Sequence, residues 1–501
     1  MKPQSIVDKA KAENAVAVAL TDVNKTCGII EFQQSARKHS IKPIVGAEVS
    51  FETLFSKEMK GFSNRMILLA ESPQGHANIN QIVSMSSLDR TEGKQIFIEQ
   101  WFGKVSTEGI VCLSGFENSD LGQLLLRGKN QDAEDLVDFY KSVFPGRFFL
   151  EVQRDGSDEF ETLTKQMILL SQKTGTPIVA THPNLFEKES DALANELKNC
   201  IFNGEYINDI NRRKIAKPTH RYKSAAEMIQ SFQDLPEAIE NTNEIAKLCN
   251  FDMALGQNTL PEFVAGGPAK ESKLLAQLSN AGLDRRMMTL FPNDEIRNAN
   301  LARYQARLDE EVGIIEKMGF SGYFLIVQDF IAWSKKNEVP IGPGRGSGAG
   351  SLVAYCLEIT DIDPIENDLL FERFLNPERV SMPDFDIDIC GVKRDSVIEY
   401  MRKRYGDEKV AQIGSYSTLA SRSALNAVGR ALQAPRSIYE GLSALVPMEA
   451  NTPIDLKQAY ETSENFAAAV NESPEAREIY DAAVLVEDQP RGMGTHAAGI
   501  V

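Results

Sequence analysis

Residues 340–351 have the sequence PIGPGRGSGAGS, and the apolar residues 352–357, LVAYCL, follow directly. Glycine occupies every second position from Gly342 to Gly350. Glycine weakens helices and strands, so such a run is expected only where the backbone bends unusually or closely approaches another group. We therefore predict that a strand ends near residue 341 and that a glycine loop leads into a helix starting near Leu352.

This glycine loop (residues 342–351) predicts a site for phosphate groups. Its backbone can approach an anion closely, the first N–H groups of the following helix are expected to point at that anion, and Arg345 adds positive charge. It is not a Walker loop, because no Lys-Ser/Thr pair follows the glycines, and it lacks the Gly-x-Gly-x-x-Gly spacing of dinucleotide folds. A solvent-exposed turn without a ligand is the alternative.

An alternation of acidic and apolar residues follows at 381–390, SMPDFDIDIC. In a strand, period two places Asp384, Asp386 and Asp388 on one face, where their carboxylates repel one another. Divalent cations remove this conflict, and oxygen ligands suit magnesium, so we predict a site for two ions about 3.5–4 Å apart. An edge strand with a solvated acidic face is the alternative.

Positive charge is concentrated in residues 392–445, with nine basic and five acidic side chains. The whole chain has 54 Lys and Arg against 71 Asp and Glu, a net charge of -17, so nucleic-acid contact is expected to be local. The candidates for DNA binding are Lys393, Arg394, Arg422 and Arg430. A solvated helical face is the alternative.

The first half of the chain has the pattern of an α/β domain. Apolar runs at 15–20, 44–46, 66–69, 109–113, 148–152 and 177–180 alternate with helical stretches, which predicts buried parallel strands in a layer or barrel. Asp22, Glu48, Glu151 and His182 lie in or just after these runs. Their spacing is not that of a metal site, so we expect at most a poor one.

Length and composition indicate a globular chain of two to four domains. The chain has 501 residues, 42% of them hydrophobic, and a mean hydropathy of -0.27. No apolar run is long enough for a membrane span, which predicts a cytoplasmic protein without a membrane partner. The six cysteines form no Cys-x-x-Cys pair, so neither a disulfide framework nor a zinc ribbon is expected.

Three segments in this order, residues 342–355, 370–379 and 382–388, resemble the bacterial family C replicative DNA polymerases. The resemblance implies a PHP-type α/β barrel-like domain at 1–255, a nucleotidyltransferase-type α+β palm at 256–417, a helical thumb at 418–495 and a returning palm segment from 496. It implies template-directed DNA synthesis from dNTPs on primer-template DNA with two Mg²⁺ ions. The residues it assigns are Asp386 and Asp388 as catalytic metal ligands, Asp384 as a supporting residue, and Arg345, Gly346, Ser347 and Arg379 as contacts of the triphosphate.

Departures from the family pattern qualify these expectations. Thr21-Asp22-Val23 and His182-Pro183-Asn184-Leu185 stand where metal-binding relatives have histidines, so metal-dependent hydrolysis is not expected. The resemblance places the first PHP strand before Met1, and the third catalytic aspartate, the fingers and the regions for the sliding clamp and other replisome subunits after Val501. Residues 1–501 alone are therefore expected not to extend a primer. A non-catalytic DNA-binding or scaffold fragment and a PHP-type phosphoesterase are the alternatives.

Overall fold

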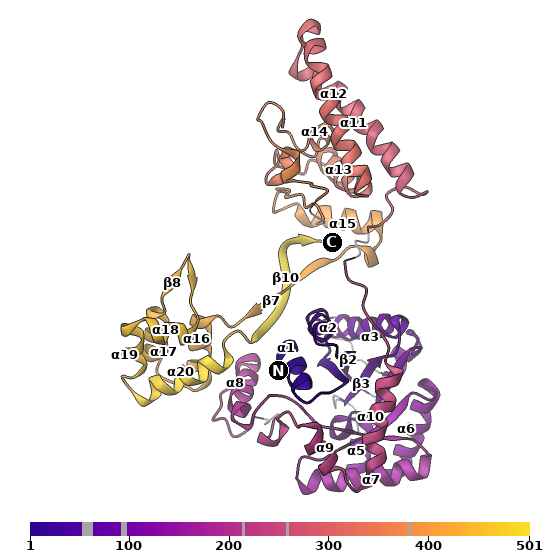
Figure 1. Cartoon of the computed structure of the whole chain (residues 1–501), viewed down its shortest axis with the longest axis vertical. Coiled ribbons are helices and arrows are strands. Elements are labelled where there is room, and N and C mark those ends of the chain that lie inside the picture. The colour runs from indigo at the N-terminus through magenta and orange to yellow at the C-terminus, as the bar shows by residue number, and fades with distance from the viewer. Residues whose placement is uncertain (53–63, 92–97, 213–215, 257–259, 379–381) are drawn as a thin grey trace. The chain divides into compact units, whose positions relative to one another are not determined.

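The computed structural model describes residues 1–52, 64–91, 98–212, 216–256, 260–378 and 382–501. It divides into two compact units, which Figure 1 shows in one view. Unit 1 comprises residues 1–255 and 416–492, and unit 2 comprises residues 256–415 and 493–501. The chain thus passes between the units three times. Arg379, a predicted triphosphate contact, lies outside the described residues.

Unit 1 begins with a six-stranded sheet in the order β1-β2-β3-β4-β5-β6. The strands are β1 (Ala17–Val23), β2 (Lys42–Phe51), β3 (Asn64–Ala70), β4 (Ile110–Leu113), β5 (Phe148–Gln153) and β6 (Ile178–Thr181). Each predicted apolar run overlaps one of these strands. The predicted α/β barrel-like domain is therefore confirmed.

The prediction that all these strands are parallel was wrong. β3 runs antiparallel to both β2 and β4, whereas the β1–β2, β4–β5 and β5–β6 pairs are parallel. Successive residues of β3 enter different apolar clusters, Leu68 in one and Leu69 in the other. A strand buried on both faces is an apolar run whichever way it points, so the sequence pattern does not carry its direction.

Helices cover the sheet and complete its core. α10 contacts β6, α3 contacts β2 and β3, and α7 contacts β5. The α-helices of residues 1–255 are α1 (Pro3–Ala12), α2 (Ile29–Lys38), α3 (Pro73–Thr91), α4 (Ile98–Phe102), α5 (Asp120–Leu126), α6 (Asn130–Val143), α7 (Asp158–Thr174), α8 (Ala192–Asn203), α9 (Ala225–Ser231) and α10 (Pro236–Leu248).

The second segment of unit 1 is helical and shares its core with α8. Leu197 and Cys200 of α8 are fully buried in one cluster with side chains from residues 419–486. The elements of this segment are α16 (Ser421–Ala431), α17 (Arg436–Leu445), β8 (Met448–Glu449), β9 (Thr452–Pro453), α18 (Leu456–Thr462), α19 (Glu464–Val470) and α20 (Pro474–Val486). The predicted helical thumb is therefore helical throughout most of its length.

Unit 2 is mainly helical around a separate core. Its elements are α11 (Pro268–Leu290), α12 (Asp294–Lys317), α13 (Ser321–Lys336), α14 (Leu352–Cys356) and α15 (Arg394–Tyr405). β7 (Gln412–Thr418) and β10 (Pro490–Ile500) pair as a two-stranded sheet, and the boundary between the units falls within both strands. Among the helices of the described chain, none combines the length and apolar character needed to cross a membrane.

Candidate functional site

The glycine loop lies directly against the acidic segment (residues 384–388) within unit 2. Ile341 and Ile389 form an antiparallel bridge, and the Gly342 N–H donates to the Asp388 carbonyl at 2.8 Å. After this contact, residues 347–350 form one 3-10 turn, and α14 starts at Leu352. The structure therefore brings together the two motifs that the sequence places about thirty residues apart.

Glycine is required at the contact between the two motifs. Gly346 has a φ of +64°, and a Cβ there would lie 2.7 Å from Asp386 Oδ2. A Cβ on Gly348 would lie 2.6 Å from Cδ1 of the Phe385 ring. Such contacts are far shorter than van der Waals packing allows, so the glycines let the loop approach the acidic segment.

The acidic segment does not form the predicted strand. Beyond the bridge at Ile389, no strand is assigned to residues 382–388, although exposure alternates as predicted: Asp384, Asp386 and Asp388 are exposed, while Phe385 is half-buried. One bridge supplies too few ladder hydrogen bonds for a strand. Instead the Phe385 side chain anchors the segment, so the carboxylates point toward solvent.

Aromatic side chains hold Phe385 in place. Tyr323 stacks on it with ring centroids 5.8 Å apart, and Phe374 packs on it at 4.7 Å. The Phe385 N–H donates to the Tyr323 hydroxyl oxygen at 3.0 Å. Burial, with a further contribution from Asp384 and Asp386, raises the pKa of Tyr323 to about 12. Tyr323 positions the acidic segment, a role that the sequence pattern did not reveal.

Arg345 lies between the two predicted catalytic carboxylates. Its Nη1 is 3.4 Å from Asp388 Oδ1, and its Nε is 3.9 Å from Asp386 Oδ2. All three side chains are more than half exposed. Ser347 and Gly346 beside it are exposed too. One guanidinium, two carboxylates and an open loop thus share one solvent-accessible surface.

The prediction that the first N–H groups of the helix after the loop face a ligand was wrong. The N–H groups of Leu352 and Val353 each donate to the Glu311 carboxylate at 3.0 Å, and that of Ala354 donates to Ser351 Oγ at 3.1 Å. Glu311 comes from α12, which is distant in sequence, so the loop sequence did not show this partner. An anion at the loop has to use its exposed part, around Arg345 and Ser347.

The predicted DNA-binding residues belong to two different units. Lys393 and Arg394 lie at the start of α15, where Lys393 Nζ donates to the Glu338 carbonyl at 2.7 Å and Arg394 Nη2 to the Ala498 carbonyl at 3.4 Å. Arg422 and Arg430 belong to unit 1. Arg422 Nη2 donates to the Val446 carbonyl at 2.6 Å beyond the end of α17, whereas Arg430 is exposed.

Glu48, Glu151 and His182, three of the four polar candidates of unit 1, are engaged with other protein groups. Glu48 pairs with Arg65 at 2.8 Å. His182 Nε2 lies 2.9 Å from the Thr219 carbonyl, and burial lowers the pKa of His182 to about 4. Within the described residues, no three His, Cys, Asp or Glu side chains are arranged to hold a metal ion.

Glu151 is the buried member of this group. It accepts hydrogen bonds from the Gly115 N–H at 2.6 Å and from Thr181 Oγ1 at 2.7 Å, and burial raises its pKa from 4.5 to about 7. The Glu151 carboxyl group therefore binds a proton more tightly in the folded state than in the unfolded state. The free energy of unfolding is expected to fall as pH rises from about 4.5 to about 7, by about 3 kcal/mol.

We expect Glu151→Gln to remove this pH dependence and to be more stable than the wild type at pH 8. The amide oxygen can accept from Gly115, and the amide nitrogen can donate to Thr181. Urea unfolding at pH 5 to 8, followed by the fluorescence of buried Trp101 in a Trp333→Phe background, measures the effect. Glu159→Gln, an exposed change in α7, is the control, and equal pH slopes in wild type and Glu151→Gln would contradict the assignment.

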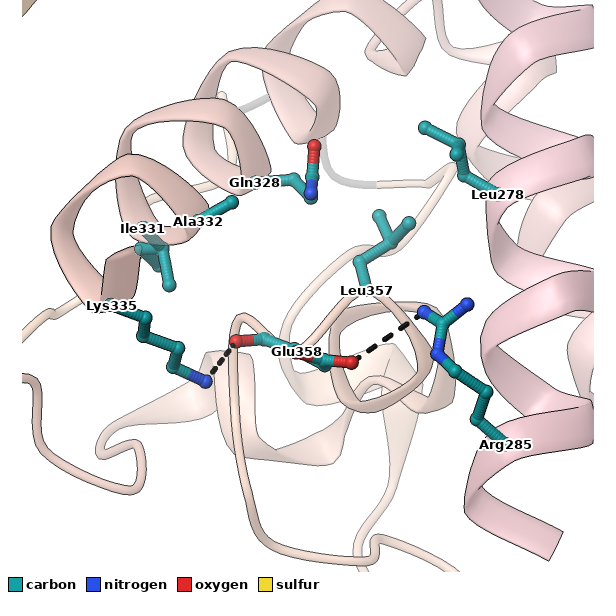
Figure 2. A pocket seen from close by; sticks show the side chains of 8 residues that line it. All are labelled: Leu278, Arg285, Gln328, Ile331, Ala332, Lys335, Leu357 and Glu358. Carbon is teal, nitrogen blue, oxygen red and sulfur yellow. Dashed lines mark hydrogen bonds and ion pairs between the residues drawn. The ribbon is translucent and has the colours of Figure 1, made fainter. Parts of the chain in front are cut away.

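A small cavity in unit 2 contains none of the predicted site residues. Figure 2 shows its lining side chains, which come from α11, α13 and the residues just after α14. Arg285 Nη2 lies 3.5 Å from Glu358 Oε1, and Lys335 Nζ donates to the Glu358 carbonyl at 2.9 Å. At about 90 Å³ the cavity has room for a few water molecules and is too small for a nucleotide.

Comparisons with known proteins match two separate stretches of the chain to family models. Residues 273–501 match the model of the bacterial DNA polymerase III alpha NTPase domain, and residues 1–155 match that of the PHP domain. A solved amidohydrolase from Chromobacterium violaceum, with bound sulfate and no metal, covers 36% of this chain and 81% of its own at 14% identity and a TM-score of 0.25. That likeness is too small to bear on function.

Curated relatives match nearly the whole chain. DNA polymerase III subunit alpha of Neisseria meningitidis serogroup B is 40% identical over 99% of this chain and 43% of its own length. The same subunit of Escherichia coli strain K12 is 40% identical over 100% of this chain and 43% of its own. The chain thus spans less than half the length of these relatives, and it belongs to the bacterial DNA polymerase III alpha-subunit family.

Proposed function

We propose that the glycine loop and the acidic segment form a nucleotidyl-transfer site for template-directed DNA synthesis. Asp386 and Asp388 hold the metal ions, while Arg345, Gly346 and Ser347 bind the triphosphate of the incoming dNTP. The observation that carries this proposal is the contact between the two motifs, which places Arg345 within 3.4 Å of Asp388 and 3.9 Å of Asp386. Family membership supports dNTPs and DNA as the substrates.

The carboxylates fit magnesium. Both are exposed, and carboxylate oxygens are the ligands that this ion prefers. When bound, Mg²⁺ neutralises negative charge on the phosphates and on the attacking and leaving oxygens. Arg345 contributes a fixed positive charge toward the phosphates, and Ser347 offers a hydroxyl donor.

DNA contacts are proposed for Lys393, Arg394 and the exposed Arg430. Arg422 is proposed as a DNA contact too. Because it donates to the Val446 carbonyl just after α17, we propose that it also supports the helical segment. A DNA affinity of electrostatic origin falls steeply with added salt. Contacts with the sliding clamp and other replisome subunits stay a prediction for regions outside residues 1–501.

Arg345→Ala is expected to change metal and nucleotide binding in opposite directions. The guanidinium competes with metal ions for the carboxylates of Asp386 and Asp388. Its loss should therefore let Mn²⁺ bind up to about fivefold more tightly. The same change removes a phosphate contact, so dATP in the presence of Mg²⁺ should bind about tenfold more weakly. Water-proton relaxation measures the first affinity, and equilibrium dialysis of labelled dATP measures the second.

Arg303→Ala is the matched control for this test, because Arg303 is an exposed arginine on α12 of the same unit. It should leave both affinities unchanged. Arg345→Ala with unaltered dATP affinity would show that the loop is only a turn, and the proposal would fail.

A further inference from the structure

We propose that Glu311, paired with Arg307, is a positioning residue that fixes the glycine loop for triphosphate binding. This inference rests on the proposed function of the loop. Glu311 lies on α12 and its side chain is fully buried. Both carboxylate oxygens of Glu311 accept hydrogen bonds from protein groups, so Glu311 acts on a ligand only through the loop.

The carboxylate of Glu311 holds the junction between the loop and α14. Its Oε2 accepts from Ser351 Oγ at 2.9 Å and from the Val353 N–H at 3.0 Å. Its Oε1 accepts from the Leu352 N–H at 3.0 Å and from Arg307 Nε at 2.7 Å. Burial raises the pKa of Glu311, and these donors oppose that shift.

Arg307 holds the loop from the carbonyl side. Its Nη2 donates to the Gly350 carbonyl at 3.1 Å and to the Leu369 carbonyl at 3.3 Å. The ion pair therefore engages the Gly350 carbonyl, the Ser351 hydroxyl and the N–H groups of Leu352 and Val353. A guanidinium in such a fork has a fixed orientation, which lysine does not reproduce.

α14 itself is too short to set the orientation of the loop. A helix of five residues closes very few hydrogen bonds of its own, so side chains from neighbouring helices must fix it. At its other end, Arg286 on α11 donates to the carbonyls of Tyr355 and Thr360, each at 3.0 Å. Ser347 stands only four residues before Ser351, so a shift at this junction moves the exposed part of the loop.

Glu311→Gln is expected to weaken dATP binding by the chain about tenfold, because the buried pair loses one charge and Arg307 is left without a counter-ion. Amides of residues 347–354 should exchange faster in hydrogen-exchange mass spectrometry. Mn²⁺ affinity at Asp386 and Asp388 should stay within about twofold, a split that general unfolding would not give. Glu310→Gln, an exposed change next to it on α12, is the control.

The double variant Arg307→Leu/Glu311→Leu separates positioning from stability. Removal of both charges should return the thermal midpoint toward that of the wild type, since an apolar pair is often as stable as a buried ion pair. The affinity for dATP should stay low, because the hydrogen bonds to residues 350–353 are still missing. Wild-type dATP affinity in Glu311→Gln, or its recovery in the double variant, would overturn the inference.

Failure of this inference differs from failure of the proposed function. If Arg345→Ala weakens dATP binding and Glu311→Gln does not, the loop binds triphosphate without help from the ion pair. If neither change weakens dATP binding, the proposed function itself is wrong.

Discussion

Asp386→Asn together with Asp388→Asn is expected to abolish specific Mn²⁺ binding by the chain. Both carboxylates are exposed beside Arg345, and amide oxygens without charge are poor ligands for a hard divalent ion. In a family polymerase that carries these residues, nucleotidyl transfer should fall by about a thousandfold or more, because positioning and charge neutralisation are lost together. Paramagnetic relaxation of water protons measures the binding, and primer extension measures the rate.

Asp384→Asn is the matched control for this pair. Asp384 is exposed on the same acidic segment but is not among the residues that Arg345 approaches within 4 Å. Its neutralisation should leave most of the Mn²⁺ affinity. An unchanged Mn²⁺ isotherm in the Asp386 and Asp388 double variant would disprove the assignment of the metal site.

Gly346→Val should weaken dATP binding by about a hundredfold and weaken Mn²⁺ binding as well. Its φ of +64° is unfavourable for a β-branched residue, and the new Cβ would stand 2.7 Å from Asp386 Oδ2. Either the loop or Asp386 has to move, so the anion and cation sites are disturbed together. Titrations of dATP and of Mn²⁺ test both effects.

Gly313→Val provides the same substitution in open space, because nothing lies within 4 Å of a Cβ at Gly313 on α12. It should leave both affinities unchanged. If Gly346→Val binds dATP as the wild type does, the close approach of loop and acidic segment has no part in ligand binding.

Local patterns predicted the elements, while distant partners decided the details of the site. The apolar runs located all six strands of the first sheet, but the antiparallel direction of β3 is invisible in a run buried on both faces. The alternation at 384–388 predicted which side chains face solvent. It did not predict that the segment lacks a strand partner, since pairing depends on residues elsewhere.

The sequence contains a signal for the role of Glu311. Tyr304, Leu308, Glu311 and Ile315 recur at helical spacing, and all four are buried on one face of α12. A charged residue at a core position of an amphipathic helix demands a buried partner. The pattern thus marks Glu311 as unusual, but the identity of its partners follows only from the three-dimensional structure.

The sharing of one core by α8 and residues 419–486 has a consequence for synthesis on the ribosome. Leu197 and Cys200 are buried against side chains that are made about 220 to 290 residues later. At roughly 5–20 residues per second, the apolar face of α8 stays uncovered for about 10–60 s. During that interval the nascent chain presents a hydrophobic surface to chaperones, so premature arrest of translation before residue 419 leaves a product prone to aggregation.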